Sequence, residues 1–171
     1  MARPTIEQIR DIKIQEFATT FRWDLYLPPP GGIGSSDDIN IRCESAEIPV
    51  KLGQLIDLTM RGFKISVNGI WNNSQDLTIQ CVESVDSKIS SILKDWTELC
   101  WDFKDSSSKD SSDIKVNGYL NRLDSNDVPV WKYDLKGVMV QSYSMNSLGS
   151  DSELLRPTII LRYDYFKEGA V

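Results

Sequence analysis

Residues 85–103 read VDSKISSILKDWTELCWDF, and this stretch decides the fold class. Its apolar residues recur at steps of three and four, which places them all on one side of a helix. These residues are Val85, Ile89, Ile92, Leu93, Trp96, Leu99, Cys100 and Phe103. Because the rest of the chain alternates like β-sheet, a sheet or barrel must cover this apolar side. The sequence therefore predicts a mainly β fold with one packed α-helix.

The charged residues of the predicted helix fall mostly on its other sides. They include Lys88, Lys94, Asp95 and Glu98. Ser84 precedes the helix and is a good N-cap, because its side-chain oxygen can accept a hydrogen bond from the first turn. We therefore expect the helix to begin at Val85, with a polar face turned outward.

Alternation of apolar and polar residues predicts strands along most of the remaining chain. The first covers residues 21–27, with four side chains inward: Phe21, Trp23, Leu25 and Leu27. After a loop at residues 28–38, a second strand is marked by Ile39, Ile41 and Cys43. Further strands are predicted at residues 77–82, 114–123, 128–135, 137–143 and 156–166. In the last of these, one face is expected to carry Ile159, Leu161, Tyr163 and Tyr165.

Residues 50–69 contain an extended candidate hairpin. Its arms are predicted at residues 52–60 and 63–67, joined by a turn at Arg61-Gly62. The apolar content is mixed along both arms, so neither face is expected to be fully polar. Since an isolated two-stranded ribbon is not stable in water, this hairpin should need neighbouring strands.

Composition limits the classes of function that the chain can have. The 171 residues fit a single domain, residues 1–171. The net charge is −6 and the pI is about 4.7, which disfavours specific nucleic-acid binding because that binding depends on Lys and Arg. The sequence has no His, and no segment has the spacing of a phosphate loop or a metal site.

Catalysis is therefore not expected, and we predict no catalytic residue, metal or cofactor. The three cysteines are Cys43, Cys81 and Cys100. Their odd number and wide spacing do not indicate a disulfide framework. We expect them to be small buried apolar residues in a reducing compartment.

Two segments stand apart from the predicted core. Residues 1–20 form an N-terminal arm, in which residues 5–8 resemble a capping box. Residues 104–113 contain only Ser, Asp and Lys and are predicted to be a flexible loop. No apolar run approaches membrane-spanning length and residues 1–10 lack an apolar signal core, so we expect no membrane binding and synthesis in the cytosol.

The order of these elements resembles the tail tube proteins of contractile-tailed bacteriophages, whose fold is shared with contractile injection systems. The resemblance rests on the strand at residues 21–27, IRCESAEIP (41–49), FKISVNG (63–69) and the helix with its central Asp95-Trp96. It continues in YDLKGV (133–138) and in the closing strand PTIILRYDYF (157–166). It covers nearly the whole chain, and its weight lies in the order and spacing of the segments together.

The resemblance implies a β-sandwich or barrel of two antiparallel sheets. Six subunits would form a ring with a continuous β-barrel around its lumen, and the rings would stack into a tube. DNA would pass through without specific binding. The expected partners are the tail sheath, baseplate and tape-measure proteins, and the expected location is the virion tail, assembled in the host bacterial cytoplasm.

The same resemblance assigns expected positions to individual residues. The lumen or inter-subunit ribbon would carry Lys51, Gln54, Asp57, Arg61, Lys64 and Ser66. Asp57 and other acids would dominate the lumen, and the cations would pair across subunits. The outer face of the helix, turned toward the sheath, would carry Lys88, Lys94, Asp95 and Glu98. Residues 5–17 and 144–153 are further interface candidates.

Other functions remain open on the sequence alone. A baseplate tube initiator, a tail-terminating protein, or the inner tube of a contractile injection system would have the same fold. A monomeric β-barrel that binds a small ligand would belong to a different class. The tube interpretation predicts rings or filaments, whereas the barrel interpretation predicts a monomer with an apolar pocket.

Overall fold

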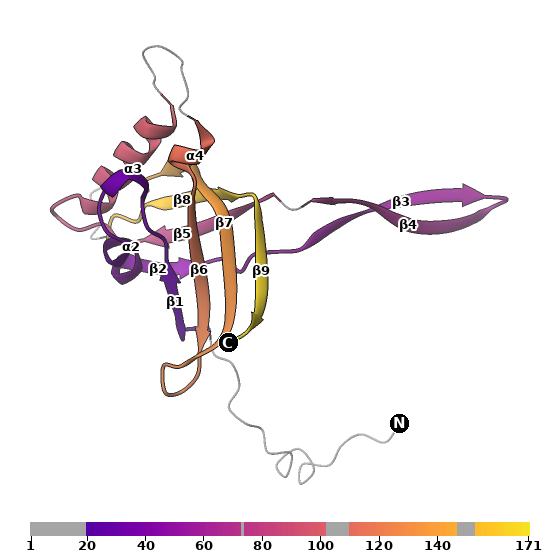
Figure 1. The fold of residues 1–171 in the computed structure, drawn as a ribbon, viewed down its shortest axis with the longest axis horizontal. Coiled ribbons are helices and arrows are strands. Elements are labelled where there is room, and N and C mark those ends of the chain that lie inside the picture. The colour runs from indigo at the N-terminus through magenta and orange to yellow at the C-terminus, as the bar shows by residue number, and fades with distance from the viewer. Residues whose placement is uncertain (1–19, 73, 102–109, 147–152) are drawn as a thin grey trace, which may run out of the picture.

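The computed structural model describes residues 20–72, 74–101, 110–146 and 153–171. Figure 1 shows a β-rich body with helices at one end and a two-stranded ribbon projecting from the other side. The strands are β1 (Trp23–Tyr26), β2 (Cys43–Ala46), β3 (Leu52–Met60), β4 (Phe63–Asn72), β5 (Gln75–Cys81), β6 (Val116–Leu123), β7 (Pro129–Ser144), β8 (Thr158–Tyr163) and β9 (Tyr165–Ala170). The helices are η1 (Pro30–Gly32), α2 (Ser36–Arg42), α3 (Lys88–Cys100) and α4 (Ser111–Ile114).

The body consists of antiparallel strands in the order β1-β6-β7-β8-β5-β2, with β9 also paired to β7. The first part of β7 pairs with β6 and β9, and its last part pairs with β8. The long strand therefore belongs to two sheets, one of β1, β6, β7 and β9 and one of β2, β5, β7 and β8. The predicted mainly β fold with two antiparallel sheets is confirmed.

Two strands that the sequence separates, at residues 128–135 and 137–143, are one strand in the structure. The chain bends at Gly137, whose backbone has a φ of +67°, a conformation that glycine adopts without steric cost. Alternation could not show this continuity, because the glycine interrupts the apolar pattern and looks like a strand end.

The predicted last strand is instead two strands, β8 and β9, separated at Asp164. Ile159, Leu161 and Tyr163 are buried as expected, but Tyr165 is 45% exposed. The backbone N–H of Asp164 donates to the carbonyl of Lys136 on β7 at 2.9 Å. This long-range contact fixes the break, so the prediction that Tyr165 shares one face with Leu161 and Tyr163 was wrong.

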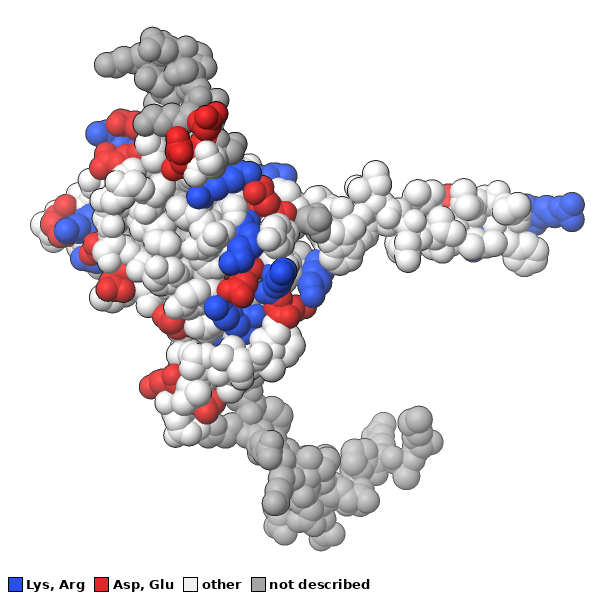
Figure 2. Space-filling view, in the orientation of Figure 1, with Lys and Arg blue, Asp and Glu red and all other residues white. Residues whose placement is uncertain are grey.

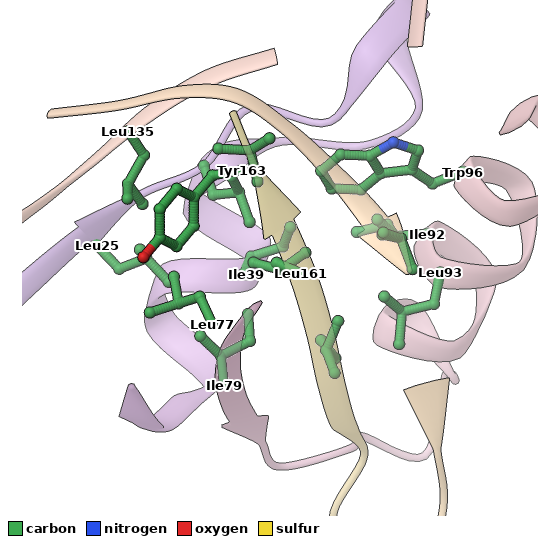
Figure 3. Close-up of a cluster of buried hydrophobic side chains, with 14 of the residues drawn as sticks. Leu25, Ile39, Leu77, Ile79, Ile92, Leu93, Trp96, Leu135, Leu161 and Tyr163 are labelled. Atoms are coloured by element: carbon green, nitrogen blue, oxygen red, sulfur yellow. The ribbon is translucent and has the colours of Figure 1, made fainter. Parts of the chain in front are cut away.

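The core lies between α3 and the sheets. Its largest fully buried side chains include Trp96 of α3 and Tyr163 of β8. Figure 3 shows Ile92, Leu93 and Trp96 directed from the helix toward the strand that carries Leu161. The indole N–H of Trp96 donates to the carbonyl of Ile114 at 3.4 Å, which satisfies the one polar atom of this buried ring.

The main helix starts three residues later than predicted. Val85 is fully exposed, and the helix is Lys88–Cys100 with Ser87 before it in the left-handed region at φ +52°. Glu83 supplies the cap in place of Ser84: its carboxylate accepts from the N–H of Ile89 at 3.1 Å and of Ser90 at 2.7 Å. Phe103, the last predicted helical residue, lies outside the described residues.

The predicted second strand was wrong at Ile39 and Ile41, because residues 36–42 form α2. Ser35 caps this helix by accepting from the N–H of Asp37 at 3.1 Å, and Asp37 and Asp38 lie in its positive first turn. Ile39 is buried, whereas Ile41 is 80% exposed. The prediction of a single helix was therefore also wrong.

Smaller corrections concern the ends of the core. The first strand begins at Trp23, and Phe21, expected inward, is 72% exposed. Part of the predicted loop at residues 104–113 is the short helix α4. The predicted N-terminal arm lies outside the described residues except for Thr20, as do residues 104–109 of that loop and residues 147–152 of the polar interface candidate.

Candidate assembly interface

The ribbon of β3 and β4 is the most distinctive surface of the molecule. Its strands pair with each other and with no other described strand. Met60 and Phe63 face each other across a two-residue turn in which Arg61 has φ +49° and Gly62 φ +85°. Two positive φ values characterise a type I′ turn, whose twist matches that of the flanking strands. The predicted arms and turn are confirmed, and the second arm continues beyond Val67 to Asn72.

One face of the outer ribbon is wholly apolar. Residues directly opposite in an antiparallel pair share a face, and successive pairs alternate between the two faces. The apolar face carries the pairs Ile56–Val67, Leu58–Ile65 and Met60–Phe63. Their exposed fractions run from 40% at Val67 to 75% at Phe63. Exposed apolar area of this continuity is typical of an interaction surface.

The other face of the outer ribbon is polar apart from Leu55. It carries the pairs Leu55–Asn68, Asp57–Ser66 and Thr59–Lys64. Figure 2 shows the result: the projecting ribbon is mostly uncharged, with basic residues at its far end. The expectation that neither face would be fully polar is confirmed by Leu55, although the register places most polar side chains on one side.

Three predicted ribbon residues meet on the polar face. The Lys64 Nζ lies 2.7 Å from the Asp57 Oδ2, and the Ser66 hydroxyl donates to the Asp57 Oδ1 at 2.6 Å. Lys64 and then Ser66 lower the pKa of Asp57, because both favour its ionised form. The charge of Asp57 is thus balanced within its own chain.

The remaining predicted ribbon residues lie elsewhere. Lys51, at the root, pairs with Glu168 of β9, and its ammonium is 5.5 Å from the ring centroid of Phe166. Gln54 lies at a bulge where the register shifts between Gly53 and Leu55. Arg61 is at the tip and forms no ion pair with any residue that the structure describes.

Gly69 of β4 lies opposite the bulge at Gln54 of β3, where the two strands approach closely. A Cβ on Gly69 would come within 3.0 Å of the Gln54 carbonyl oxygen and 3.1 Å of the Ile56 side chain. Both contacts are tighter than most Cβ atoms make, so a larger residue here would push the neighbouring strand aside by a few tenths of an ångström. Sequence reasoning about the ribbon missed this bulge.

The four predicted residues of the outer helix face are all exposed on α3: Lys88, Lys94, Asp95 and Glu98. The Lys94 Nζ and the Glu98 Oε1 lie 3.6 Å apart, one helical turn from each other. Figure 1 shows α3 at the end of the body away from the ribbon. The helix face and the ribbon can therefore contact different partners at the same time.

The described ranges contain no group of His, Cys, Asp or Glu side chains suited to a metal ion. Nor does any helix among the described residues have the length and apolar character needed to cross a membrane. All three cysteines are free thiols.

Comparison with known proteins identifies the fold. No protein-family model and no curated protein matches the sequence. Among solved structures, the tube-terminating cap of the anti-feeding prophage aligns with 98% of this chain and 100% of its own at a TM-score of 0.66 and 11% identity.

Two chains of an extracellular contractile injection system, PVC, solved in its extended state, also align with nearly the whole of this chain. A chain of its sheath–tube complex covers 98% of this chain and 99% of its own, with a TM-score of 0.64 and 13% identity. Its sheath/tube terminator covers 92% and 99%, with a TM-score of 0.68 and 12% identity. The chain therefore has the tube-type fold of contractile injection systems, in agreement with the resemblance to phage tail tubes.

Proposed function

We propose that this protein is a structural subunit that assembles into rings of six, which stack as the inner tube of a contractile tail. The observation that carries the proposal is the apolar face of the β3–β4 ribbon. That face has no cover within the described chain, and the fold is the one found in tube, cap and terminator subunits.

Burial of this face supplies the driving force for assembly. Full burial of a Leu, Ile, Met or Phe side chain stabilises an assembly by about 1.5–3 kcal/mol. The three facing pairs offer several such side chains in one continuous strip. A neighbouring subunit that covers the strip would also pair the free edges of β3 and β4, which otherwise invite uncontrolled association.

The polar face then lines the lumen. Asp57 neutralises Lys64 in the same chain, and Asn68, Thr59 and Ser66 add no charge. Such a wall does not attract phosphate groups strongly, which suits a conduit through which DNA passes without binding. Arg61, without an ion-pair partner in the described part of its own chain, is the cation available to a carboxylate of the next subunit.

The exposed face of α3 would contact the sheath, on the outside of the tube. Baseplate and tape-measure proteins would meet the ends and the lumen, and the assembled protein would lie in the tail. The competing interpretation, a monomeric ligand-binding barrel, could use an open cleft of about 450 Å³ between β1, β2 and β6. It is less favoured because it leaves the exposed apolar face of the ribbon without a function. The role is structural, with no catalytic step.

Negative-stain electron microscopy of the purified full chain tests the proposal. Six-membered rings or hollow tubes are expected. The matched variants are Leu58→Asn on the apolar face and Thr59→Asn on the polar face of the same strand. Leu58→Asn should remain monomeric at concentrations where the wild type and Thr59→Asn assemble. A wild-type chain that stays monomeric at high concentration, or equal assembly of the two variants, would refute the proposal.

Position along the tail is a separate question. A tube subunit stacks without limit, whereas a terminator, baseplate initiator or cap forms a single ring or a short stack. Structures of tube and terminator type align with this chain at TM-scores of 0.64 and 0.68, which do not separate the roles. The length distribution of the assemblies in the same micrographs separates them, and we expect long tubes.

A further inference from the structure

Cys43 and Cys81 face each other across the paired strands β2 and β5. The neighbouring pair, Arg42 and Val82, is joined by a hydrogen bond from the Val82 N–H to the Arg42 carbonyl at 2.8 Å. Hydrogen-bonded and non-hydrogen-bonded pairs alternate along an antiparallel ladder. The Cys43–Cys81 pair is therefore a non-hydrogen-bonded pair, and the N–H of Cys81 donates instead to the Pro157 carbonyl at 2.9 Å.

This position has the backbone geometry of a disulfide. In non-hydrogen-bonded antiparallel pairs the Cα atoms are about 4.5 Å apart and both side chains project from the same face. Disulfides join Cα atoms that are about 4.4–6.8 Å apart. The register therefore places the two sulfurs where a disulfide can join them, beside the bulge that follows Cys43. The sequence places the two cysteines 38 positions apart, so only the register reveals that they are neighbours.

The two thiols have different surroundings. Cys81 is fully buried, whereas Cys43 is half-buried on β2, which lies at the end of the strand order. A hydrogen bond from the Cys81 thiol lowers the pKa of Cys43, and the same bond together with burial raises the pKa of Cys81. Cys43 is thus the accessible sulfur that more readily ionises, and Cys81 is held against it.

We propose that Cys43 and Cys81 are a redox modification site that forms an intramolecular disulfide with a peroxide oxidant. The ionised Cys43 sulfur attacks one peroxide oxygen, the O–O bond breaks, and hydroxide leaves as Cys43 becomes a sulfenic acid. The Cys81 sulfur then attacks the Cys43 sulfur, the S–S bond forms, the S–O bond breaks, and water leaves with the Cys81 proton. Two thiols are oxidised while one hydrogen peroxide is reduced to two waters.

The bond would act on the root of the ribbon. β3 and β4 both lie between Cys43 and Cys81 in the sequence, so the disulfide closes a loop that contains the entire ribbon. In the described part of the chain, β2 is paired only with β5. Oxidation would therefore tie this edge strand to the sheet and hold the ribbon at its base. The inference does not depend on assembly into a tube.

The experiment uses the reduced full chain treated with hydrogen peroxide after removal of the reductant. Thiol titration of the unfolded product should give one free thiol in place of the three in the sequence. Peptide mapping without reduction should join Cys43 to Cys81, and the thermal midpoint should rise and return with dithiothreitol. Cys100→Ala is the matched control, since it removes the remaining thiol and should leave the cross-link unchanged.

Cys43→Ser should abolish the cross-link, and its half-buried position keeps folding intact. Cys81→Ala is a second loss variant that keeps a small apolar group in the core. A disulfide that includes Cys100, a bond between two chains on non-reducing gels, or stable higher oxidation of Cys43 with Cys81 still a thiol would each overturn the proposal.

Discussion

Asp164 lies directly over Gly137, at the place where the chain twice passes from one sheet to the other. A Cβ on Gly137 would come within 2.1 Å of the Asp164 Oδ2, and Gly137 itself has φ +67°. The Asp164 carboxylate also accepts from the Lys115 ammonium at 2.7 Å. The bend of β7 and the break between β8 and β9 are thus packed against each other and depend on one glycine.

The first prediction follows from this contact. Gly137→Ala should lower the free energy of unfolding by about 2–4 kcal/mol, because the left-handed backbone costs about 1–2 kcal/mol and displacement of Asp164 adds a packing cost. Urea denaturation measures the loss. Gly169→Ala on β9 is the control, since its Cβ would meet no atom within 4 Å and its φ is not positive. Equal stability of the two variants would contradict the role given to the bend.

The ribbon could be predicted from sequence because its signals are local. The turn at Arg61-Gly62 sets the register, and the register decides that Asp57 faces Ser66. The ion pair between Lys51 and Glu168 could not be predicted, because 117 positions separate them and only the tertiary fold brings them together. The sequence therefore predicts the pairing along the ribbon, but not the contacts between the base of the ribbon and the body of the protein.

The errors in the prediction of the fold have similar causes. Ile39 and Ile41 alternate like a strand, but Ser35 and the acids that follow cap a helix, and this local signal was stronger than the short alternation. The kink after Tyr163 depends on the bend of β7, to which Asp164 binds. Where one element is shaped by contact with another, periodicity alone gives the wrong boundary.

The second prediction concerns the carboxylate that caps α3. Glu83→Ala should destabilise the protein by about 1–2 kcal/mol at neutral pH, because the Ile89 and Ser90 N–H groups lose their acceptor. Glu98→Ala is the matched control: it removes an exposed helix carboxylate and should cost less than about 0.5 kcal/mol. Thermal unfolding compares the two variants.

The same carboxylate predicts a pH dependence. Burial raises the pKa of Glu83, but hydrogen bonds from Ser90, Ser84 and Ile89 outweigh this effect and lower the pKa below its ordinary value of 4.5. The contribution of the Glu83 carboxylate to stability is therefore complete when the pH is above the ordinary pKa, and it is lost as the pH falls through the lowered pKa. The stability difference between the wild type and Glu83→Ala should shrink on acidification, and a difference independent of pH would show that the charge has no part in the cap.

The third prediction tests the tip of the ribbon. Asn is favoured where Arg61 now has a positive φ, so Arg61→Asn should stabilise the turn by about 1 kcal/mol and slow amide hydrogen exchange in β3 and β4. If Arg61 pairs with a neighbouring subunit as proposed, the same variant should assemble less well at low salt. Arg61→Lys keeps the charge and should retain assembly. If Arg61→Asn assembles more strongly than the wild type, Arg61 acts only through the geometry of the turn and makes no ion pair with a neighbouring subunit.

The fourth prediction separates a lumen residue from an interface residue. Asp57→Asn should leave ring formation and stacking intact, because in the proposed tube the polar face of the ribbon lines the lumen. Loss of stacking in this variant would instead place Asp57 at an interface. Ser66→Ala serves as the control, since it removes the second partner of the same carboxylate without a change of charge.

The ion pair on that face also predicts an order of titration effects. Lys64 is the larger cause of the lowered pKa of Asp57, and Ser66 is the smaller one. Carboxyl NMR titration should therefore show the pKa of Asp57 rising further toward its ordinary 3.8 in Lys64→Met than in Ser66→Ala. Because the pKa of Asp57 is depressed, the ion pair stabilises the ribbon fully when the pH is above the ordinary pKa. This stabilisation is lost as the pH falls through the lowered pKa. The reverse order of the two variants would mean that the hydroxyl, and not the ammonium, holds the charge on Asp57.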